Sequence, residues 1–141
     1  MHYINELSEN QIRDFLIALS FIMNADGEAS EAEKEYIKVA ASAYGLVDPD
    51  FELIMKERSL GEVERQINWI REKPEAARYM IREMISLAIS DGELVDDEIN
   101  TIFYIGKRLG ISEDRMNDMT NWAVEGYEWQ IEGFRLVEEN E

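Results

Sequence analysis

Two short acidic stretches carry the residues whose types and spacing could do chemistry. The pattern Asp-Gly-Glu-x4-Glu occurs at residues 26–33 and again at residues 91–98. Its carboxylates are Asp26, Glu28 and Glu33 in the first copy, and Asp91, Glu93 and Glu98 in the second. A site built from carboxylate oxygens, without His or Cys, suits Ca²⁺ or Mg²⁺ rather than Zn²⁺. These six residues are therefore candidate ligands of a divalent cation.

The same residues also have a purely structural interpretation, and the sequence leaves both open. Gly27 and Gly92 follow apolar stretches, at points where a helix commonly ends in a left-handed residue. Asp26 can accept backbone amides in such a turn, and Glu33 occupies the capping-box position of the next helix. An ordinary EF-hand is excluded, because counting back from the first glycine places Ile22 at the first ligand position.

Helix-start and helix-stop signals around these turns predict an all-α fold. Serine followed three residues later by Gln or Glu forms capping boxes at residues 8–11, 30–33 and 59–62. Asp48-Pro49 is expected to start a further helix, and Ser112 to cap another. The best-defined predicted helices cover residues 9–25, 75–90 and 96–109. Nowhere in the sequence is there the alternation typical of a β-strand.

The chain matches itself when it is shifted by 65 residues. Both acidic stretches coincide, and so do the glycines that end the following helices, Gly45 and Gly110. Such self-similarity predicts a duplicated motif of about four helices. We expect one domain, residues 1–141, made of two repeats at about residues 8–73 and 74–138. The strongly apolar first helix of each repeat is expected to lie at the centre, next to its counterpart.

The C-terminal stretch repeats apolar residues at helical spacing over residues 122–137. It predicts one long helix, or two that break near residues 121–126. Three of its apolar residues are expected to face the core: Tyr127, Ile131 and Phe134. Trp122 and Trp129 lie off that stripe, and an exposed Trp here would indicate a surface that binds a partner. Dimerisation through this segment stays open.

Charge and composition exclude several classes of function. The chain has 31 acidic and 14 basic residues and a net charge of −17, which argues against binding nucleic acid or an anionic membrane surface. Without Cys, no disulfide or thiol chemistry is available. His2 is the only His, which excludes paired Glu-x-x-His di-iron chemistry and a Ser-His-Asp triad at a buried site. We therefore expect no enzymatic activity and no organic cofactor.

Membrane insertion and export are not expected either. The longest nearly apolar run, residues 15–23, is shorter than the roughly 20 residues that span a bilayer, and the N-terminal residues do not form a secretory signal. A cytoplasmic location is the resulting expectation.

One basic patch stands out: Arg78, Arg82, Lys107 and Arg108. We expect Arg78 and Arg82 to pair with Glu75 and Glu83 on a solvated face.

The paired acidic turns, each lying between an apolar helix and a helix that stops at Gly, resemble the TerB-like family. That family includes the tellurite-resistance protein TerB and the N-terminal domain of certain DnaJ-type membrane co-chaperones. The resemblance covers roughly residues 8–121. It implies a duplicated four-helix fold, a role in tellurite and other stress resistance, and divalent-cation binding through the six acidic residues named above. The second turn departs from the first, with Val95 in place of Ser30.

Together these observations predict a non-enzymatic, acidic stress-response or adaptor domain. Its partner would be a protein with a basic surface, because opposite charge steers association, and divalent cations would contribute. The alternative is a dedicated binding protein for Ca²⁺ or Mg²⁺ that uses the two Asp-Gly-Glu turns. A small hydrolase or transferase with carboxylate catalysis fits less well, since no nucleophile or ligand motif accompanies the carboxylates. The oligomeric state is not predicted.

Overall fold

The computed structural model describes residues 2–25, 27, 29–47, 49–89 and 96–140. The regular structure of these residues is entirely helical, which confirms the all-α class. The helices are α1 (His2–Asn5), α2 (Glu9–Met23), α3 (Glu31–Ala43), α4 (Phe51–Met55), α5 (Leu60–Ile67), the 3-10 helix η1 (Asn68–Glu72), α6 (Pro74–Ile89), α7 (Asp96–Arg108) and α8 (Glu113–Glu138). Within the described ranges, none of them has the length and apolarity needed to cross a membrane.

The helix starts at serine residues are confirmed. Ser8 Oγ accepts a hydrogen bond from the Gln11 amide at 3.2 Å, while the Ser8 amide donates to Gln11 Oε1 at 3.0 Å. The capping boxes of α3 and α5 have the same reciprocal geometry, and Ser112 caps α8. Each cap satisfies backbone amides that the first turn of a helix leaves without partners.

The predicted start at Asp48-Pro49 is wrong. Asp48 lies outside the described residues, and α4 begins only at Phe51. Asp50 is the residue that caps it, because its Oδ1 accepts a hydrogen bond from the Leu53 amide at 3.1 Å. A second acidic residue two positions along the chain therefore takes the cap, and Pro49 precedes the helix rather than occupying its first turn.

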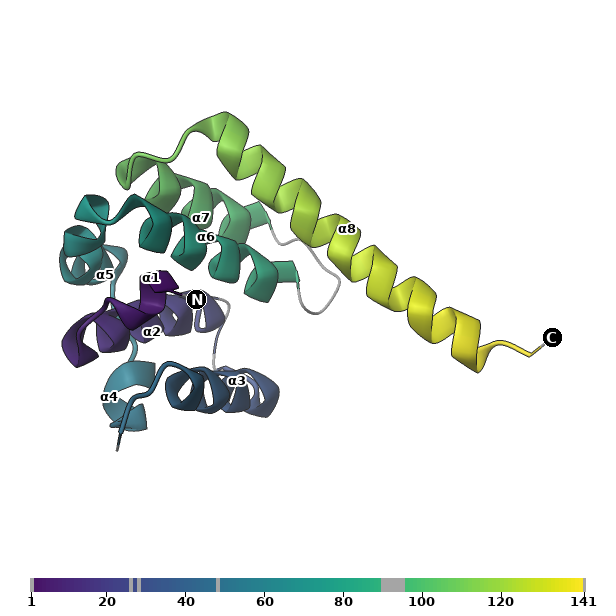
Figure 1. Ribbon diagram of the computed structural model, residues 1–141, viewed down its shortest axis with the longest axis horizontal. Coiled ribbons are helices and arrows are strands. Elements are labelled where there is room, and N and C mark those ends of the chain that lie inside the picture. Colours follow the sequence, from purple (N-terminus) through teal and green to yellow (C-terminus); the bar gives the residue numbers. More distant parts are fainter. Residues whose placement is uncertain (1, 26, 28, 48, 90–95, 141) are drawn as a thin grey trace.

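Helices α2 and α6 contact each other and most of the other described helices. α2 packs against α3, α4, α5 and α6, while α6 also contacts α1, η1, α7 and α8 (Figure 1). Their largest fully buried side chains include Phe15, Leu19, Met80 and Ile85. A helix surrounded on most sides must be apolar on most sides, and α6 keeps a polar side only at Glu75, Arg78, Arg82 and Glu83.

The two halves of the chain share some local geometry and then diverge. α3 and α7 both end at a glycine with positive φ, +81° at Gly45 and +86° at Gly110. After each glycine the next amide, of Leu46 or Ile111, donates to a carbonyl five residues back, at 3.0 Å in both cases. Beyond this point the first half continues as α4, α5 and η1, whereas the second half continues as the single helix α8.

α8 is one continuous helix of 26 residues. At about 1.5 Å per residue it is roughly 39 Å long, against roughly 24 Å for α6. Its first half packs on α6 and α7, and Figure 1 shows its C-terminal half projecting beyond the rest of the molecule. The alternative of two shorter helices with a break near residues 121–126 is excluded.

Candidate functional site

The acidic turns predicted as cation sites lie mostly outside the described residues. This applies to Asp26, Glu28, Asp91 and Glu93. The two remaining candidates, Glu33 and Glu98, lie in the first turns of α3 and α7. Among the described residues, no three acidic or His side chains gather closely enough to hold a metal ion, and most of the two turns lies outside those residues.

Glu33 has the role that its capping-box position predicts. Its Oε1 accepts a hydrogen bond from the Ser30 amide at 2.9 Å, and the Glu33 amide donates to Ser30 Oγ at 3.1 Å. Glu98, at the matching position of the second half, is 9% exposed. Exposure therefore distinguishes two residues that the sequence pattern treats as equivalent. The structural interpretation is confirmed for Glu33, while cation binding by the turns remains a prediction.

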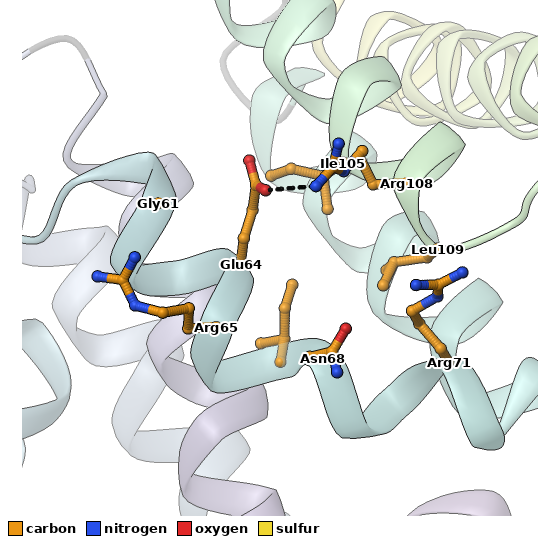
Figure 2. A pocket seen from close by; sticks show the side chains of 9 residues that line it. Gly61, Glu64, Arg65, Asn68, Arg71, Ile105, Arg108 and Leu109 are labelled. Carbon is orange, nitrogen blue, oxygen red and sulfur yellow. Dashed lines mark ion pairs between the residues drawn. The ribbon is translucent and has the colours of Figure 1, made fainter.

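Three residues of the predicted basic patch line two pockets, Arg108 in one and Arg78 and Arg82 in the other. One pocket of about 350 Å³ opens between the α5–η1 segment and α7. It is lined by Gly61, Glu64, Arg65, Ile67, Asn68, Arg71, Ile105, Arg108 and Leu109. Glu64 pairs with Arg108 across it at 3.5 Å, and Figure 2 shows Arg65 directed away from that pair. The guanidinium groups of Arg65, Arg71 and Arg108 do not converge on one point, so the pocket does not form an anion-binding site.

The other part of the basic patch lies between α6 and the start of α8. Arg78, Arg82 and Arg115 line a pocket of about 240 Å³ there. Arg82 pairs with Glu83 at 3.2 Å, as the sequence predicts. Arg115 was not predicted, since it lies 33 residues beyond Arg82 and only packing brings the two together.

A partly buried polar network joins α3, α6 and α8. Tyr36 of α3 donates a hydrogen bond to Glu83 Oε2 at 2.6 Å. The guanidinium of Arg82, the ion-pair partner of Glu83, lies 5.0 Å from the centre of the Tyr79 ring and 5.2 Å from that of Trp122 in α8, within cation–π range. Burial and the hydrogen bond to Glu83 raise the pKa of Tyr36. Tyr36 thus donates to Glu83, and the contact of Arg82 with Trp122 links α6 to α8.

The C-terminal half of α8 exposes an unusual amount of apolar side chain. We define the distal α8 surface as Trp129, Ile131, Phe134, Leu136 and Val137. Exposed fractions reach 77% at Trp129 and 84% at Val137. The prediction that Ile131 and Phe134 face the core is wrong, because they are 47% and 61% exposed, while Tyr127 is half-buried. The apolar stripe of α8 continues beyond the point where the rest of the molecule covers the helix.

A groove of about 320 Å³ adjoins the distal α8 surface. It runs along α8 beside the C-terminal end of α6. Its walls are Ser86, Ile89, Trp122, Ala123, Gly126, Tyr127, Trp129 and Gln130. Trp122 and Trp129 are both exposed, but so are Ile131 and Phe134, so exposure does not separate the two Trp residues from the predicted stripe.

Acidic side chains occupy the other side of the same half-helix. At 3.6 residues per turn, Glu125, Glu128, Glu132 and Glu139 fall in one narrow row. Arg135 lies within that row and bonds to Glu132 and, at 2.9 Å, to Glu139. The bond to Arg135 lowers the pKa of Glu132. The projecting helix thus carries apolar side chains around most of its circumference and one acidic row, with Glu138 outside that row.

Comparisons of the chain with protein-family models, with curated proteins and with solved structures found no match.

Proposed function

We propose that this chain is a non-enzymatic adaptor domain of the TerB-like kind that binds a protein partner through the projecting half of α8. The distal α8 surface carries the proposal. The largest apolar patch on a typical monomer covers about 300–600 Å² and is often functional. Five large apolar side chains on one projecting half-helix reach the upper part of that range, and aromatic residues such as Trp129 and Phe134 are those that anchor interfaces.

Charge indicates the kind of partner. The chain carries a net charge of −17, and the row of Glu125, Glu128, Glu132 and Glu139 extends along the projecting half-helix. A partner that contacts this row must offer Lys or Arg, because like charges across an interface are costly. Such contacts would be exposed, so their contribution should fall as salt is added. A role in stress resistance follows from the TerB-like resemblance and is part of the same proposal.

The alternative function, dedicated binding of Ca²⁺ or Mg²⁺ by the acidic turns, has no supporting observation among the described residues. It is kept as an alternative because four of its six ligands lie outside them.

Site-specific photo-crosslinking in the host cell tests the adaptor proposal. A crosslinking amino acid replaces Trp129 on the apolar side, Glu128 on the acidic side, or Val39, an exposed residue of α3, as the matched control. We expect a discrete protein adduct from Trp129 or Glu128 and none from Val39. An adduct from Glu128 should disappear when Glu125 and Glu132 are replaced by Gln. Equal labelling from all three positions would contradict the proposal.

A further inference from the structure

The distal half of α8 carries a second apolar row besides the stripe that continues from the core. Trp122, Trp129 and Leu136 recur every seven residues, which is close to two helical turns. Gly126 and Gly133 lie between them on the same side, also seven residues apart. A Cβ added at either glycine would meet nothing within 4 Å. This side of the helix is therefore open, and a second helix can approach its backbone closely at the two glycines.

The groove beside α8 and the side chains that protrude from its C-terminal end are complementary parts of one surface. The groove involves residues 122–130 of α8, together with Ile89 of α6. The protruding residues Phe134, Leu136 and Val137 follow it along the same helix and are all more than half exposed. A surface that contains both a recess and the side chains to fill it can pair with itself around a two-fold axis.

We propose that the distal α8 surface is the seam of a homodimer in which two α8 helices pair antiparallel. This goes beyond the proposed function, because a second copy and a basic partner would occupy the same surface in separate complexes. With the axis between Trp129 and Gln130, Val137 lies level with Trp122 of the second copy, and Gly126 lies level with its Gly133. The C-terminal apolar side chains of each copy then enter the groove of the other.

The area available is a large part of what a stable dimer needs. Five apolar side chains on this side of α8 are exposed by 53–84%: Trp122, Trp129, Phe134, Leu136 and Val137. Weighted by exposure, they present on the order of 500 Å² per copy. A standard interface buries about 800 Å² on each partner. The walls of the groove on α6 and the polar edges of the helix supply the remaining area.

Charge opposes pairing rather than guiding it. Glu125 and Glu132 lie about one helical turn from Trp129 and flank the seam, while Glu128 lies further around the helix. Each copy also carries −17, so the two repel at long range. The dimer must therefore tighten as salt is added, whereas binding to a basic partner must weaken. Salt dependence separates the two occupants of this surface.

Sedimentation equilibrium of the full chain at 0.05 M and 0.5 M NaCl tests self-association. We expect a species of twice the 16.4 kDa chain mass, with a Kd about tenfold lower at the higher salt concentration. Trp129→Gln should raise the Kd at least 30-fold or so, as for a central interface residue. Glu128→Gln, the matched control on the acidic side, should not raise it. Both positions are exposed, so neither variant is expected to unfold the chain.

Disulfide trapping tests the geometry, because the chain has no cysteine of its own. Gln130→Cys, next to the axis, should form a disulfide-linked dimer with itself. Val137→Cys should not, but it should form one when mixed with Trp122→Cys. Self-linking of Val137→Cys would indicate parallel pairing and overturn the proposal.

A monomer at both salt concentrations, up to about 0.1 mM protein, would also overturn the dimer. The adaptor function fails separately, if Trp129 and Glu128 give no adduct beyond that of the Val39 control in cells. A monomeric chain that crosslinks to a different protein from Trp129 would refute the dimer and support the adaptor.

Discussion

Gly126→Ala and Gly133→Ala should both stabilise the projecting half of α8. Neither glycine has a positive φ, and the added methyl group would meet no atom within 4 Å. Alanine is favoured over glycine in a helix interior by about 0.8–1.0 kcal/mol. Because the substitution creates no clash and strains no dihedral angle, the full propensity difference is available at each position.

The gain is local, since this half of the helix projects from the body. It should appear as slower amide exchange rather than as a large change in the melting temperature. About 1 kcal/mol corresponds to roughly fivefold slower exchange for each substitution, and roughly 25-fold for the pair. Hydrogen exchange of the peptide covering residues 126–138, at low salt and low protein concentration, measures this in the monomer.

Gly45→Ala is the matched control with the opposite sign. Its φ of +81° lies in the left-handed region, where a Cβ costs roughly 1–2 kcal/mol. This glycine ends α3 inside the body, so the loss should appear in global unfolding. If Gly126→Ala accelerates exchange in the monomer, or if residues 126–138 of the wild type show no protection, the continuous and uncrowded helix described here is incorrect.

In the dimer the same two substitutions should act in the opposite direction. The glycines lie where the paired helices approach most closely, so two added methyl groups per copy would separate the backbones. The variant would then have a better-protected monomeric helix and a higher dimer Kd. Helix propensity alone predicts no weakening of association, so a higher Kd for a more stable helix is evidence for contact at the glycines.

Three further predictions concern the body and the turns. Gly106→Ala should destabilise the chain by about 1–3 kcal/mol through overpacking, because the new Cβ would lie 2.5 Å from Sδ of the buried Met116. In a Met116→Ala background the same substitution should stabilise the chain by about 1 kcal/mol. If urea unfolding gives the same sign in both backgrounds, the predicted clash is refuted. Burial raises the pKa of Asp14, so its negative charge opposes folding at neutral pH and stops doing so as the pH falls through its folded pKa. Asp14→Asn should therefore raise the free energy of unfolding at pH 7 and lose that advantage below about pH 4. If the variant is still more stable than the wild type in thermal unfolding at pH 3, burial of the charge is not the cause. If the acidic turns bind a cation, Ca²⁺ or Mg²⁺ at 100 times its Kd should add about 2.7 kcal/mol to the free energy of unfolding, measured by thermal unfolding at fixed ionic strength. The double variant Asp26→Ala/Asp91→Ala should lose this stabilisation. Equal effects of all divalent cations would instead indicate that the turns only stop and cap helices.

Local features of the fold could be predicted from the sequence because they depend on few neighbouring atoms. A serine cap needs only its own hydroxyl and an amide three residues away, which is why Ser8, Ser30, Ser59 and Ser112 start helices as predicted. The α4 start was missed because two acidic residues, Asp48 and Asp50, flank Pro49 and both can cap. Propensity favours neither, and the packing of α4 against α2 accompanies the later start.

The sequence could not show whether other helices bury the C-terminal apolar stripe of α8, because this depends on the relative lengths of two helices far apart in the sequence. Residues that continue the stripe of Met116 and Ala123 have the pattern of a core face. They are exposed because α6 has 16 residues and α8 has 26. Periodicity shows which side of a helix is apolar, but not how far its neighbour extends. The cation prediction concerns turns largely outside the described residues, so the structure leaves it as it was.

The direction in which α8 projects is itself determined by residues of the body. Arg82 lies near the rings of both Tyr79 and Trp122, and its partner Glu83 accepts the hydrogen bond from Tyr36. α3, α6 and α8 are thereby joined at one level, immediately before α8 leaves the body. Trp122 has two roles in this arrangement: one face of its ring contacts Arg82, and its exposed part forms a wall of the groove. An interface built on the distal half of α8 is therefore held in a fixed orientation by a network in the body, so that a substitution at Tyr36 or Glu83 should alter association without touching the seam.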